Sequence, residues 1–321
     1  MLLPFHNVVR DDFDAVNALI IQQLHSDVGL VENIGQHLID AGGKRLRPLL
    51  VLLAAKACGY RGRDHIALAA IIEFIHTATL LHDDVVDTSD LRRGRATANA
   101  RWGNAPSVLV GDFLYSRSFQ MMVGLQNMAV MAILADTTNL ISEGEVQQLV
   151  NAGNDKISES DYFSVIDRKT AQLFKAAAEV GAIIAGADAT TTQNLAQYGH
   201  HLGMAYQLAD DALDYAGTSA DMGKNIGDDL AEGKVTLPLI HVLNRGTDEQ
   251  IALVRAAIRD GGLDYLNAIK TAIKDTGAID HTLQTAQKHS QIAFKLLAGL
   301  NDSEEKRALQ ELAEFAHRRT F

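Results

Sequence analysis

The sequence predicts an all-α protein, and three observations support that fold class. The 321 residues include only four prolines, so long stretches lack the strongest helix breaker. Alanine and leucine recur three and four residues apart along most of the chain, which is the spacing of one helical face. Runs that alternate apolar and polar residues between turn signals, as strands do, are hard to find.

Clusters of Gly, Asn and Asp, some with Pro, divide the chain into about ten or more predicted helices. These breaks lie at residues 41–48, 59–64, 101–107, 151–155, 185–188, 220–234, 244–250, 260–262 and 275–277. Ser158 with Asp161 and Thr190 with Gln193 match capping boxes, so we expect helices to begin there. No Pro/Ser-rich linker or tandem repeat separates the pieces, and we therefore expect one all-α domain that spans residues 1–321.

Composition excludes several classes of function. A formal net charge of -11 argues against general binding of nucleic acid or anionic membranes, because both need a basic face. The single cysteine, Cys58, cannot form an internal disulfide, which suits a reducing compartment. We find no signal peptide and no uncharged apolar run close to the roughly 18 residues of a membrane span. The sequence predicts a soluble, cytoplasmic protein with no transmembrane segment.

An Asp-Asp-x-x-Asp arrangement follows an apolar helical run at two places. The first cluster comprises Asp83, Asp84 and Asp87, and the second comprises Asp210, Asp211 and Asp214. Residues four apart share a helix face about 6 Å apart, so Asp83 and Asp87 point the same way while Asp84 turns roughly 100° aside. Oxygen donors of this kind suit magnesium, which is usually held by one or two carboxylates plus phosphate oxygens of a substrate.

A single such cluster is usually a solvated helix face. Here the arrangement occurs twice after apolar residues, and each copy is followed by basic residues, so we interpret both as functional. The candidate phosphate ligands are Lys44, Arg45, Arg92, Arg93, Lys169, Lys224 and Lys234. Arginine can donate two hydrogen bonds to one phosphate. His76 lies about two turns before Asp83 on nearly the same face, so both an anion contact and simple packing stay open for it.

Six segments, in this order, resemble the trans-isoprenyl diphosphate synthase family. They are GGKRLRP (42–48), LLHDDVVDTSDLRRG (80–94), GDFL (111–114), KTAQLF (169–174), YQLADDALDY (206–215) and GKNIGDDLAEGKVTLPLI (223–240). The resemblance implies a single helical bundle around a central cavity, with the two aspartate-rich helices facing each other across it. It also implies two or three Mg²⁺ ions per active site and a homodimer.

The resemblance assigns roles to individual residues. Asp83, Asp84, Asp87 and Asp210, and by extension Asp211 and Asp214, would bind the magnesium that holds the diphosphate of an allylic substrate. Arg92, Lys169, Lys224 and Lys234 would assist with that diphosphate. Lys44, Arg45, His76 and Arg93 match positions that bind the diphosphate of isopentenyl diphosphate. Thr170 and Gln207 match polar positions near the reacting carbons. Because none of the chief motif residues is missing, we expect an active enzyme.

The expected reaction is elongation of an allylic diphosphate, with farnesyl diphosphate as the expected starter. Loss of the diphosphate leaves a carbocation, the double bond of isopentenyl diphosphate attacks it, and a proton then leaves. Ala78 and Thr79 lie about one turn before Asp83, where bulky aromatics in this family stop the chain early. Both are small here. The expected floor further away comprises Phe119, Met122 and Met131, so we expect a long product, octaprenyl diphosphate first, of a length that suits quinone side chains.

Other readings of the sequence stay open. A shorter, geranylgeranyl product is one, and a non-catalytic subunit of a prenyl synthase is another. A metal-dependent phosphohydrolase would explain the adjacent His82 and Asp83 but leaves the second aspartate cluster without a role. A terpene cyclase shares the all-α fold, but it would not need a second diphosphate site.

Overall fold

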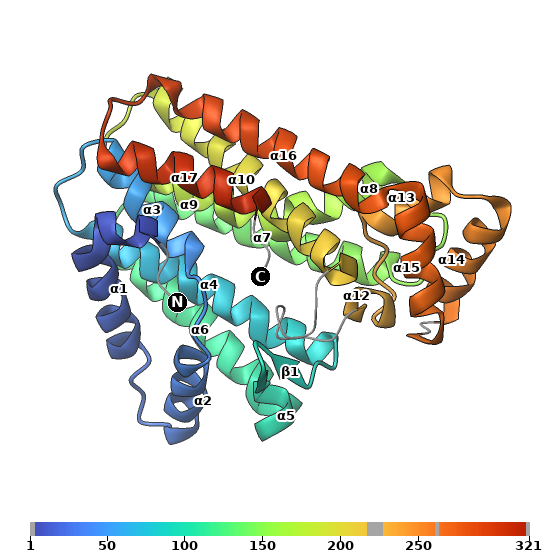
Figure 1. Ribbon diagram of the computed structural model, residues 1–321. Coiled ribbons are helices and arrows are strands. Elements are labelled where there is room, and N and C mark those ends of the chain that lie inside the picture. The colour runs from blue at the N-terminus through green and yellow to red at the C-terminus, as the bar shows by residue number, and fades with distance from the viewer. Residues whose placement is uncertain (1–3, 217–226, 261–262, 319–321) are drawn as a thin grey trace. The chain divides into compact units, whose positions relative to one another are not determined.

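The computed structural model describes residues 4–216, 227–260 and 263–318, and nearly all of these are helical, which confirms the predicted all-α class (Figure 1). The first elements are η1 (Pro4–Val9), α1 (Arg10–Gln23), α2 (Gly29–Asp40), α3 (Leu46–Ala57), α4 (Asp64–Val86), β1 (Leu91–Arg92), β2 (Arg95–Ala96), α5 (Ala98–Trp102), α6 (Asn104–Gly124) and α7 (Met128–Asn151). They are followed by α8 (Glu159–Ile166), the π-helical turn η2 (Asp167–Ala171), α9 (Gln172–Ile184), α10 (Ala189–Ala216), α12 (Asp228–Ala231), α13 (Leu237–Arg245), α14 (Asp248–Asp260), η3 (Leu263–Tyr265), α15 (Leu266–Thr276), α16 (Ala278–Leu296), η4 (Leu297–Gly299) and α17 (Glu304–Arg318).

The chain forms two compact units, each built from three separate segments. Unit 1 comprises Met1–Thr138, Leu173–Gly199 and Phe294–Leu312, and unit 2 comprises Asn139–Gln172, His200–Ala293 and Ala313–Phe321. The chain thus passes repeatedly between the units, and helices α7, α10, α16 and α17 contribute residues to both. That interleaving explains why the sequence contains no linker. The single domain over residues 1–321 stays a prediction.

Helix α3 forms the centre of unit 1. Its residues Leu49–Ala55 are completely buried, so the helix is surrounded on every side, as its unbroken apolar sequence requires. Glycine allows α9 to approach it closely. A Cβ on Gly181 would lie 2.8 Å from the carbonyl oxygen of Val51, a distance that only a residue without a side chain tolerates.

Helix α4 packs beside α3, α1 and α6 in the same unit. Within the described residues it is also the one helix long and apolar enough to cross a membrane, with a mean hydropathy of 1.4. However, 61% of that apolar window is buried inside the protein, as in the core helix of a soluble protein. The absence of a transmembrane segment stays a prediction, and the burial of α4 agrees with it.

A short β-hairpin interrupts the helices of unit 1, and the sequence did not suggest it. Leu91 pairs with Ala96 and Arg92 with Arg95 in antiparallel register. The two residues between the strands, Arg93 and Gly94, have φ angles of 53° and 73°. Two consecutive positive φ angles are typical of a type I′ turn, the connection that best matches the twist of a hairpin. Strands of two residues leave too little alternation for a sequence pattern to reveal.

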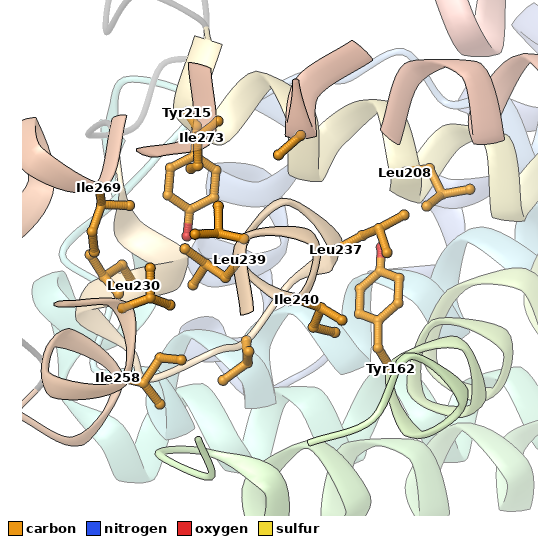
Figure 2. Packing of buried hydrophobic residues seen from close by; sticks show 14 of the residues in the cluster. Tyr162, Leu208, Tyr215, Leu230, Leu237, Leu239, Ile240, Ile258, Ile269 and Ile273 are labelled. Carbon is orange, nitrogen blue, oxygen red and sulfur yellow. The ribbon is translucent and has the colours of Figure 1, made fainter. Parts of the chain in front are cut away.

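Unit 2 has its own apolar core, to which α8, α10, α12, α13, α14 and α15 contribute (Figure 2). Tyr162 of α8 and Tyr215 of α10 supply the largest side chains, and leucines and isoleucines of the other helices pack with them. Leu237, Leu239 and Ile240 place most of α13 inside this core. The part of α10 that carries the second acidic cluster therefore packs within unit 2.

The two predicted capping boxes had different outcomes. Ser158 accepts a hydrogen bond from the N–H of Asp161, and the carboxylate of Asp161 accepts one from the N–H of Ser158, so this box is confirmed. The box at Thr190 was wrong. Helix α10 begins at Ala189, and the carboxylate of Asp188 accepts from the N–H of Thr191 at 2.8 Å. Asp188 lies one residue before the helix and reaches the exposed N–H groups that Thr190, inside the helix, does not.

A histidine pair in unit 2 predicts acid sensitivity. Burial lowers the pKa of both His201 and His289 to about 4, and the two Nδ1 atoms are 2.9 Å apart. Because the folded state favours the neutral rings, stability should fall as the pH drops from about 6.5 toward 4. Both side chains are partly exposed, so solvent screening leaves a loss of about 1 kcal/mol between pH 7 and 5.

The measurement is urea unfolding at pH 7 and pH 5 for the wild type and the His289→Gln variant. We expect the variant to lose less stability on acidification than the wild type. Gln287→Ala changes an exposed residue of the same helix that does not titrate, so it serves as the control and should leave the pH dependence as it is. An equal loss in the wild type and His289→Gln would remove the pair as the cause.

Candidate active site

The first acidic cluster lies at the C-terminal end of α4. Asp83 and Asp87 are half-buried and four residues apart, whereas Asp84 is buried at 3% exposure. The helix ends in a Schellman motif, in which Ser89 N–H donates to the carbonyl of Asp84 (2.9 Å) and Thr88 N–H to that of Val85 (3.3 Å). Thr88 occupies the left-handed position, φ 50°, that glycine usually fills, at a cost of about 1–2 kcal/mol.

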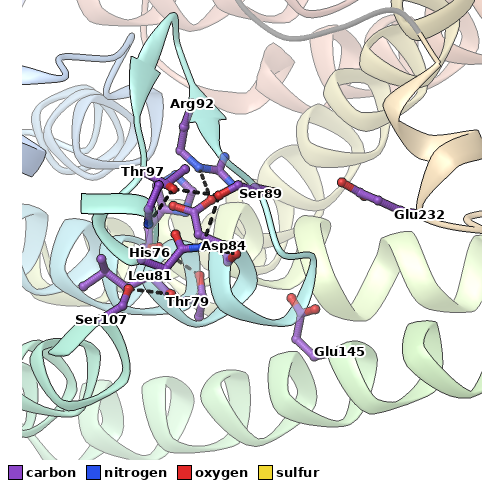
Figure 3. A network of polar contacts seen from close by, with 12 residues as sticks. His76, Thr79, Leu81, Asp84, Ser89, Arg92, Thr97, Ser107, Glu145 and Glu232 are labelled. Atoms are coloured by element: carbon purple, nitrogen blue, oxygen red, sulfur yellow. Dashed lines mark hydrogen bonds and ion pairs between the residues drawn. The ribbon is translucent and has the colours of Figure 1, made fainter. Parts of the chain in front are cut away.

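Asp84 faces an arginine of the hairpin. Nε and Nη2 of Arg92 each lie 2.7 Å from Oδ1 of Asp84 (Figure 3). Burial raises the pKa of Asp84, and the Arg92 guanidinium opposes that rise. The sequence assigned Asp84 to the metal and Arg92 to the diphosphate. In this structure the two residues form an ion pair, and the metal role of Asp84 stays a prediction.

A cavity within unit 1 brings most of the predicted basic residues together. It encloses about 790 Å³ between protein atoms, part of it open to solvent. Arg45, His76, Arg92 and Arg93 line it, as predicted for a diphosphate site, and Arg95 lies in the same wall. Four guanidinium groups against two lining carboxylates, Glu73 and Asp84, leave this wall with a net positive charge that favours anions, in a chain with a net charge of -11.

Other residues hold these arginines in place. Arg45 donates from Nη1 to Oδ1 of Asn17 at 3.0 Å, and its Nε lies 3.9 Å from a carboxylate oxygen of Glu73. Arg93 donates to the carbonyl of Gly42, and its guanidinium lies where a Cβ of Gly43 would be. The Gly-Gly turn therefore accommodates an arginine from the hairpin. Lys44 does not line the cavity, and its carbonyl instead lies 3.1 Å from Nε2 of His6.

His76 is a neutral hydrogen-bond acceptor in this setting. Its Nε2 lies 3.1 Å from Nη1 of Arg47, which can only donate. Burial, followed by the charges of Arg47, Arg93 and Arg92, holds the pKa of His76 well below its usual range. The structure therefore places His76 in the cavity wall, where the sequence left it open between an anion contact and packing.

The residues predicted to control product length all belong to unit 1. Ala78 is completely buried on α4, and the hydroxyl of its neighbour Thr79 donates to the carbonyl of His76 at 2.8 Å. Met122 of α6 is buried, and Phe119 and Met131 are half-buried on α6 and α7. Helices α4 and α6 pack against each other, as a wall made from both would require. The roles of these five residues stay predictions.

The second acidic cluster lies near the end of α10, in unit 2. Asp210 is half-buried, and Asp211 and Asp214 are buried. Oδ2 of Asp211 accepts a 2.5 Å hydrogen bond from the hydroxyl of Tyr162, and Oδ1 accepts a 2.8 Å bond from the amide of Gln207. Burial first, and then the charge of Asp229, raises the pKa of Asp211 to about 8. Its oxygens face neutral donors, and its predicted metal role stays a prediction.

A second cavity, within unit 2, brings the predicted residues of that unit together. Lys169, Thr170, Gln207, Asp211 and Lys234 all line it. The hydroxyl of Thr170 donates to the amide oxygen of Gln207 at 3.0 Å, which extends the hydrogen-bonded chain that ends at Asp211. Lys234 lies 2.5 Å from a carboxylate oxygen of Glu232. Lys224, predicted as a further phosphate ligand, falls outside the described residues.

A π-helical turn positions Lys169. Residues Asp167–Ala171 form this turn between α8 and α9, and such turns are frequent at functional sites because they redirect one side chain. The ammonium group of Lys169 donates to Glu145 at 2.6 Å and to Gln148 at 2.7 Å, both on α7. These contacts hold the ammonium group of Lys169 at the cavity wall.

Several residues of the unit 2 cavity were not predicted from the sequence. Tyr162, Gln148 and Asp229 line it, and none of them was predicted as a site residue. Asp229 could have been found, because Asp228 and Asp229 form a third acidic pair inside a segment already singled out. Tyr162 and Gln148 give no signal of their own, since isolated aromatic and amide residues on helices are mostly structural.

The donor chemistry at both clusters fits a hard divalent metal. The acidic residues of both clusters offer carboxylate oxygens, the ligands that suit magnesium or calcium. Within the described part of the chain, no three acidic, histidine or cysteine side chains converge into a ready-made metal cage. This arrangement fits a metal that takes one or two carboxylates from the protein and its other ligands from a diphosphate and water.

Comparison with known proteins extends this interpretation. A sequence model of the polyprenyl synthetase family matches residues 28–275. The chain is 48% identical over 319 residues to the octaprenyl diphosphate synthase of Escherichia coli (strain K12), with 99% of both chains covered. It is 48% identical over 314 residues to that of Haemophilus influenzae, with 97% of this chain and 94% of the other covered.

The fold also matches that of a solved relative that binds ligands. The polyprenyl synthase of Caulobacter crescentus CB15, complexed with calcium and isoprenyl diphosphate, has a TM-score of 0.96 and 44% identity, with 99% of this chain and 97% of that chain covered. A match of this extent, on a chain that keeps both aspartate clusters, defines a trans-prenyltransferase. The chain belongs to the polyprenyl synthetase family, whose members act on isoprenoid diphosphates and depend on a metal.

The π-helical turn predicts a sensitive glycine. A Cβ on Gly144 of α7 would lie 2.8 Å from Cβ of Arg168 and 2.8 Å from the backbone nitrogen of Lys169. Gly144→Ala should therefore push the turn away from α7 and displace Lys169, lowering kcat about tenfold. Gly124→Ala is the matched control, because a Cβ at that helical glycine meets nothing within 4 Å.

Steady-state elongation assays of both variants make the measurement, and circular dichroism confirms that each is folded. A folded Gly144→Ala enzyme with the kcat of the Gly124→Ala control would show that the placement of Lys169 by α7 does not matter for catalysis.

Proposed function

We propose that the protein condenses an allylic diphosphate, farnesyl diphosphate first, with successive isopentenyl diphosphate units. The product is a long-chain all-trans polyprenyl diphosphate, and octaprenyl diphosphate is the expected length. The names of the relatives that match almost the whole chain at 48% identity support this length. A relative named as a geranylgeranyl diphosphate synthase is less similar, at 33% identity over 89% of the chain.

The arginine-lined cavity of unit 1 is the observation that carries this proposal. An elongating synthase must hold two diphosphates, one on each substrate, whereas a terpene cyclase or a phosphohydrolase holds one. Arg45, Arg93 and Arg95 line a cavity beside the first acidic cluster and are additional to the cations of unit 2. Such a second cationic site is what isopentenyl diphosphate requires.

The proposed assignment separates metal ligands from direct diphosphate ligands. We place magnesium on Asp83, Asp87 and Asp210, with Asp84, Asp211 and Asp214 as further candidates. The allylic diphosphate contacts Arg92, Lys169, Lys224 and Lys234. The diphosphate of isopentenyl diphosphate contacts Lys44, Arg45, His76 and Arg93. The arginine and lysine side chains of both sets donate charge-assisted hydrogen bonds to the diphosphates, and such bonds are about twice as strong as neutral ones.

The proposed chemistry depends on the separation of charge between the leaving diphosphate and the allylic carbon. Bound magnesium supplies positive charge where the leaving diphosphate becomes more negative. Arg92 and Lys169 hold that diphosphate in a fixed orientation, so stabilisation needs no rearrangement as the carbon–oxygen bond breaks. Arg45 and Arg93 hold isopentenyl diphosphate so that its double bond meets the allylic carbon. Thr170 and Gln207, hydrogen-bonded to each other, place neutral dipoles near the cation.

Incubation of the purified protein with farnesyl diphosphate, isopentenyl diphosphate and MgCl₂ tests the proposal. Reversed-phase chromatography of the dephosphorylated products should show octaprenol, and an excess of EDTA should abolish its formation. A sample extracted without the dephosphorylation step separates the alternatives, because free farnesol supports the phosphohydrolase, a cyclic hydrocarbon the cyclase and unchanged farnesyl diphosphate the non-catalytic subunit, and each contradicts elongation.

The buried Ala78 predicts control of product length. An Ala78→Phe variant places a large ring on the face of α4 that precedes the aspartates, so chain growth should stop earlier and shorter prenols should dominate. Leu68→Phe, two to three turns further from the aspartates on the same buried helix, is the control. The same chromatography reads the result. Products of unchanged length from a folded, active Ala78→Phe enzyme would rule out this gate.

An exposed apolar stripe supports the expected homodimer. Val146, Leu149 and Val150 lie on one face of α7 and are 61%, 63% and 74% exposed. Apolar residues grouped in this way usually mark a protein interface. We propose a homodimer that uses this face, and light scattering should give about twice the 34.8 kDa of the chain. Leu149→Glu should shift the mass toward the monomer, and a wild-type monomer would refute the dimer.

A further inference from the structure

The amide of Asn99 joins two backbone carbonyls at the end of α4. Its Nδ2 lies 3.1 Å from the carbonyl oxygen of Asp84 and 3.1 Å from that of Ser89. The Ser89 carbonyl also accepts from the hydroxyl of Thr97 at 2.6 Å (Figure 3). Because carbonyl oxygens only accept hydrogen bonds, the nitrogen of the Asn99 amide must be the atom that faces them.

These bonds connect the two ends of the segment from Asp84 to Asn99. Asp84 is held twice, since its carboxylate accepts from Arg92 and its carbonyl accepts from Asn99. Between these contacts the chain forms the whole hairpin, including Arg93 and Arg95. The hairpin arginines are consequently fixed to the same helix end that carries Asp83 and Asp87.

The hydrogen bonds of Asn99 also span a residue in an unfavourable backbone conformation. Thr88, between Asp84 and Ser89, has a φ angle of 50°, which a β-branched residue rarely adopts. Such conformations persist where the surroundings over-determine them, and they concentrate at functional sites. Asn99 binds the carbonyl of Asp84, four residues before Thr88, and that of Ser89, directly after it, so this amide adds a side-chain contact across the same turn that the backbone bonds of the Schellman motif close.

We propose that Asn99 is a positioning residue that sets the hairpin arginines relative to the metal-binding aspartates of α4. Asn99 itself touches neither substrate nor metal. The proposal rests on the proposed function, in which Asp83 and Asp87 hold magnesium and the arginines hold diphosphate. Arginine recognises a diphosphate through a rigid, planar set of donors, so a small displacement of the hairpin weakens both the metal-bound and the arginine-bound contacts together.

The test compares Asn99→Ala and Asn99→Asp with Asn104→Asp. Asn99→Ala removes the donor, and Asn99→Asp places a carboxylate against two carbonyl oxygens. Asn104 is exposed at the start of α6, and its change to Asp is the matched control for the added charge. Thr97→Val provides a second route to the same turn, because it removes the other donor to the Ser89 carbonyl.

Two measurements are made at a temperature where circular dichroism shows each variant to be folded. Isothermal titration calorimetry with inorganic pyrophosphate in the presence of MgCl₂ gives the Kd for pyrophosphate without turnover. Elongation assays give KM for isopentenyl diphosphate and the Mg²⁺ concentration for half-maximal rate. We expect all three constants to rise about tenfold in Asn99→Ala, more in Asn99→Asp, and less than twofold in Asn104→Asp.

A merely structural role gives a different result. A folded Asn99→Ala protein with a lower melting temperature but wild-type constants would overturn the proposal. If neither Asn99 variant folds, Thr97→Val decides in the same way, with raised constants in support and unchanged ones against. Failure of the proposed function is distinct, because the wild type itself would then not elongate farnesyl diphosphate.

Discussion

Repulsion between carboxylates that one helix holds a turn apart is the constraint that shapes both acidic clusters. Two unit charges about 6 Å apart repel by about 3 kcal/mol at an effective dielectric constant of about 20. In unit 1 a cation reduces this repulsion, because the guanidinium of Arg92, in the hairpin, forms an ion pair with Asp84. In unit 2 the neutral side chains of Tyr162 and Gln207 donate hydrogen bonds to Asp211. The raised pKa of Asp211 favours its protonated, uncharged form, which removes one charge from the cluster. In the proposed function, a divalent cation adds the remaining positive charge at both clusters.

The residues around these clusters depend on irregular backbone. Thr88 and Arg93 have positive φ angles without being glycine, and Lys169 lies in a π-helical turn. Each irregularity is held from outside its own segment. Asn99 donates to the carbonyls of Asp84 and Ser89, which flank the turn at Thr88. Arg93 donates to the Gly42 carbonyl, and Gly144 leaves room for the turn at Lys169. Regular helices thus provide rigidity, and the irregular positions direct the charged groups.

Much of this could be predicted from sequence because helices translate spacing directly into geometry. The spacing of Asp83 and Asp87 follows that rule, whereas the grouping of Lys169, Thr170 and Gln207 was expected only from the family resemblance. The rest depends on contacts between distant segments. The hairpin needed a type I′ turn at Arg93, the partner of Asp211 is 49 residues away in the chain, and the start of α10 depended on Asp188 rather than Thr190. Spacing carries no information about such contacts.

The burial of α4 fixes the distance between the proposed metal ligands and the residues proposed to control product length. Ala78 precedes Asp83 by five residues, which is about 7.5 Å along a helix axis. That separation is fixed only if α4 cannot bend or slide, and its packing against α1, α3 and α6, with Phe74, Ile75, Ala78 and Leu81 buried, prevents both. In the proposed function, a rigid helix that binds the diphosphate end of the substrate at one point also sets the distance at which its side chains meet the growing hydrocarbon. The proposed chemistry and the proposed control of chain length are then coupled, because one buried helix carries the residues assigned to both.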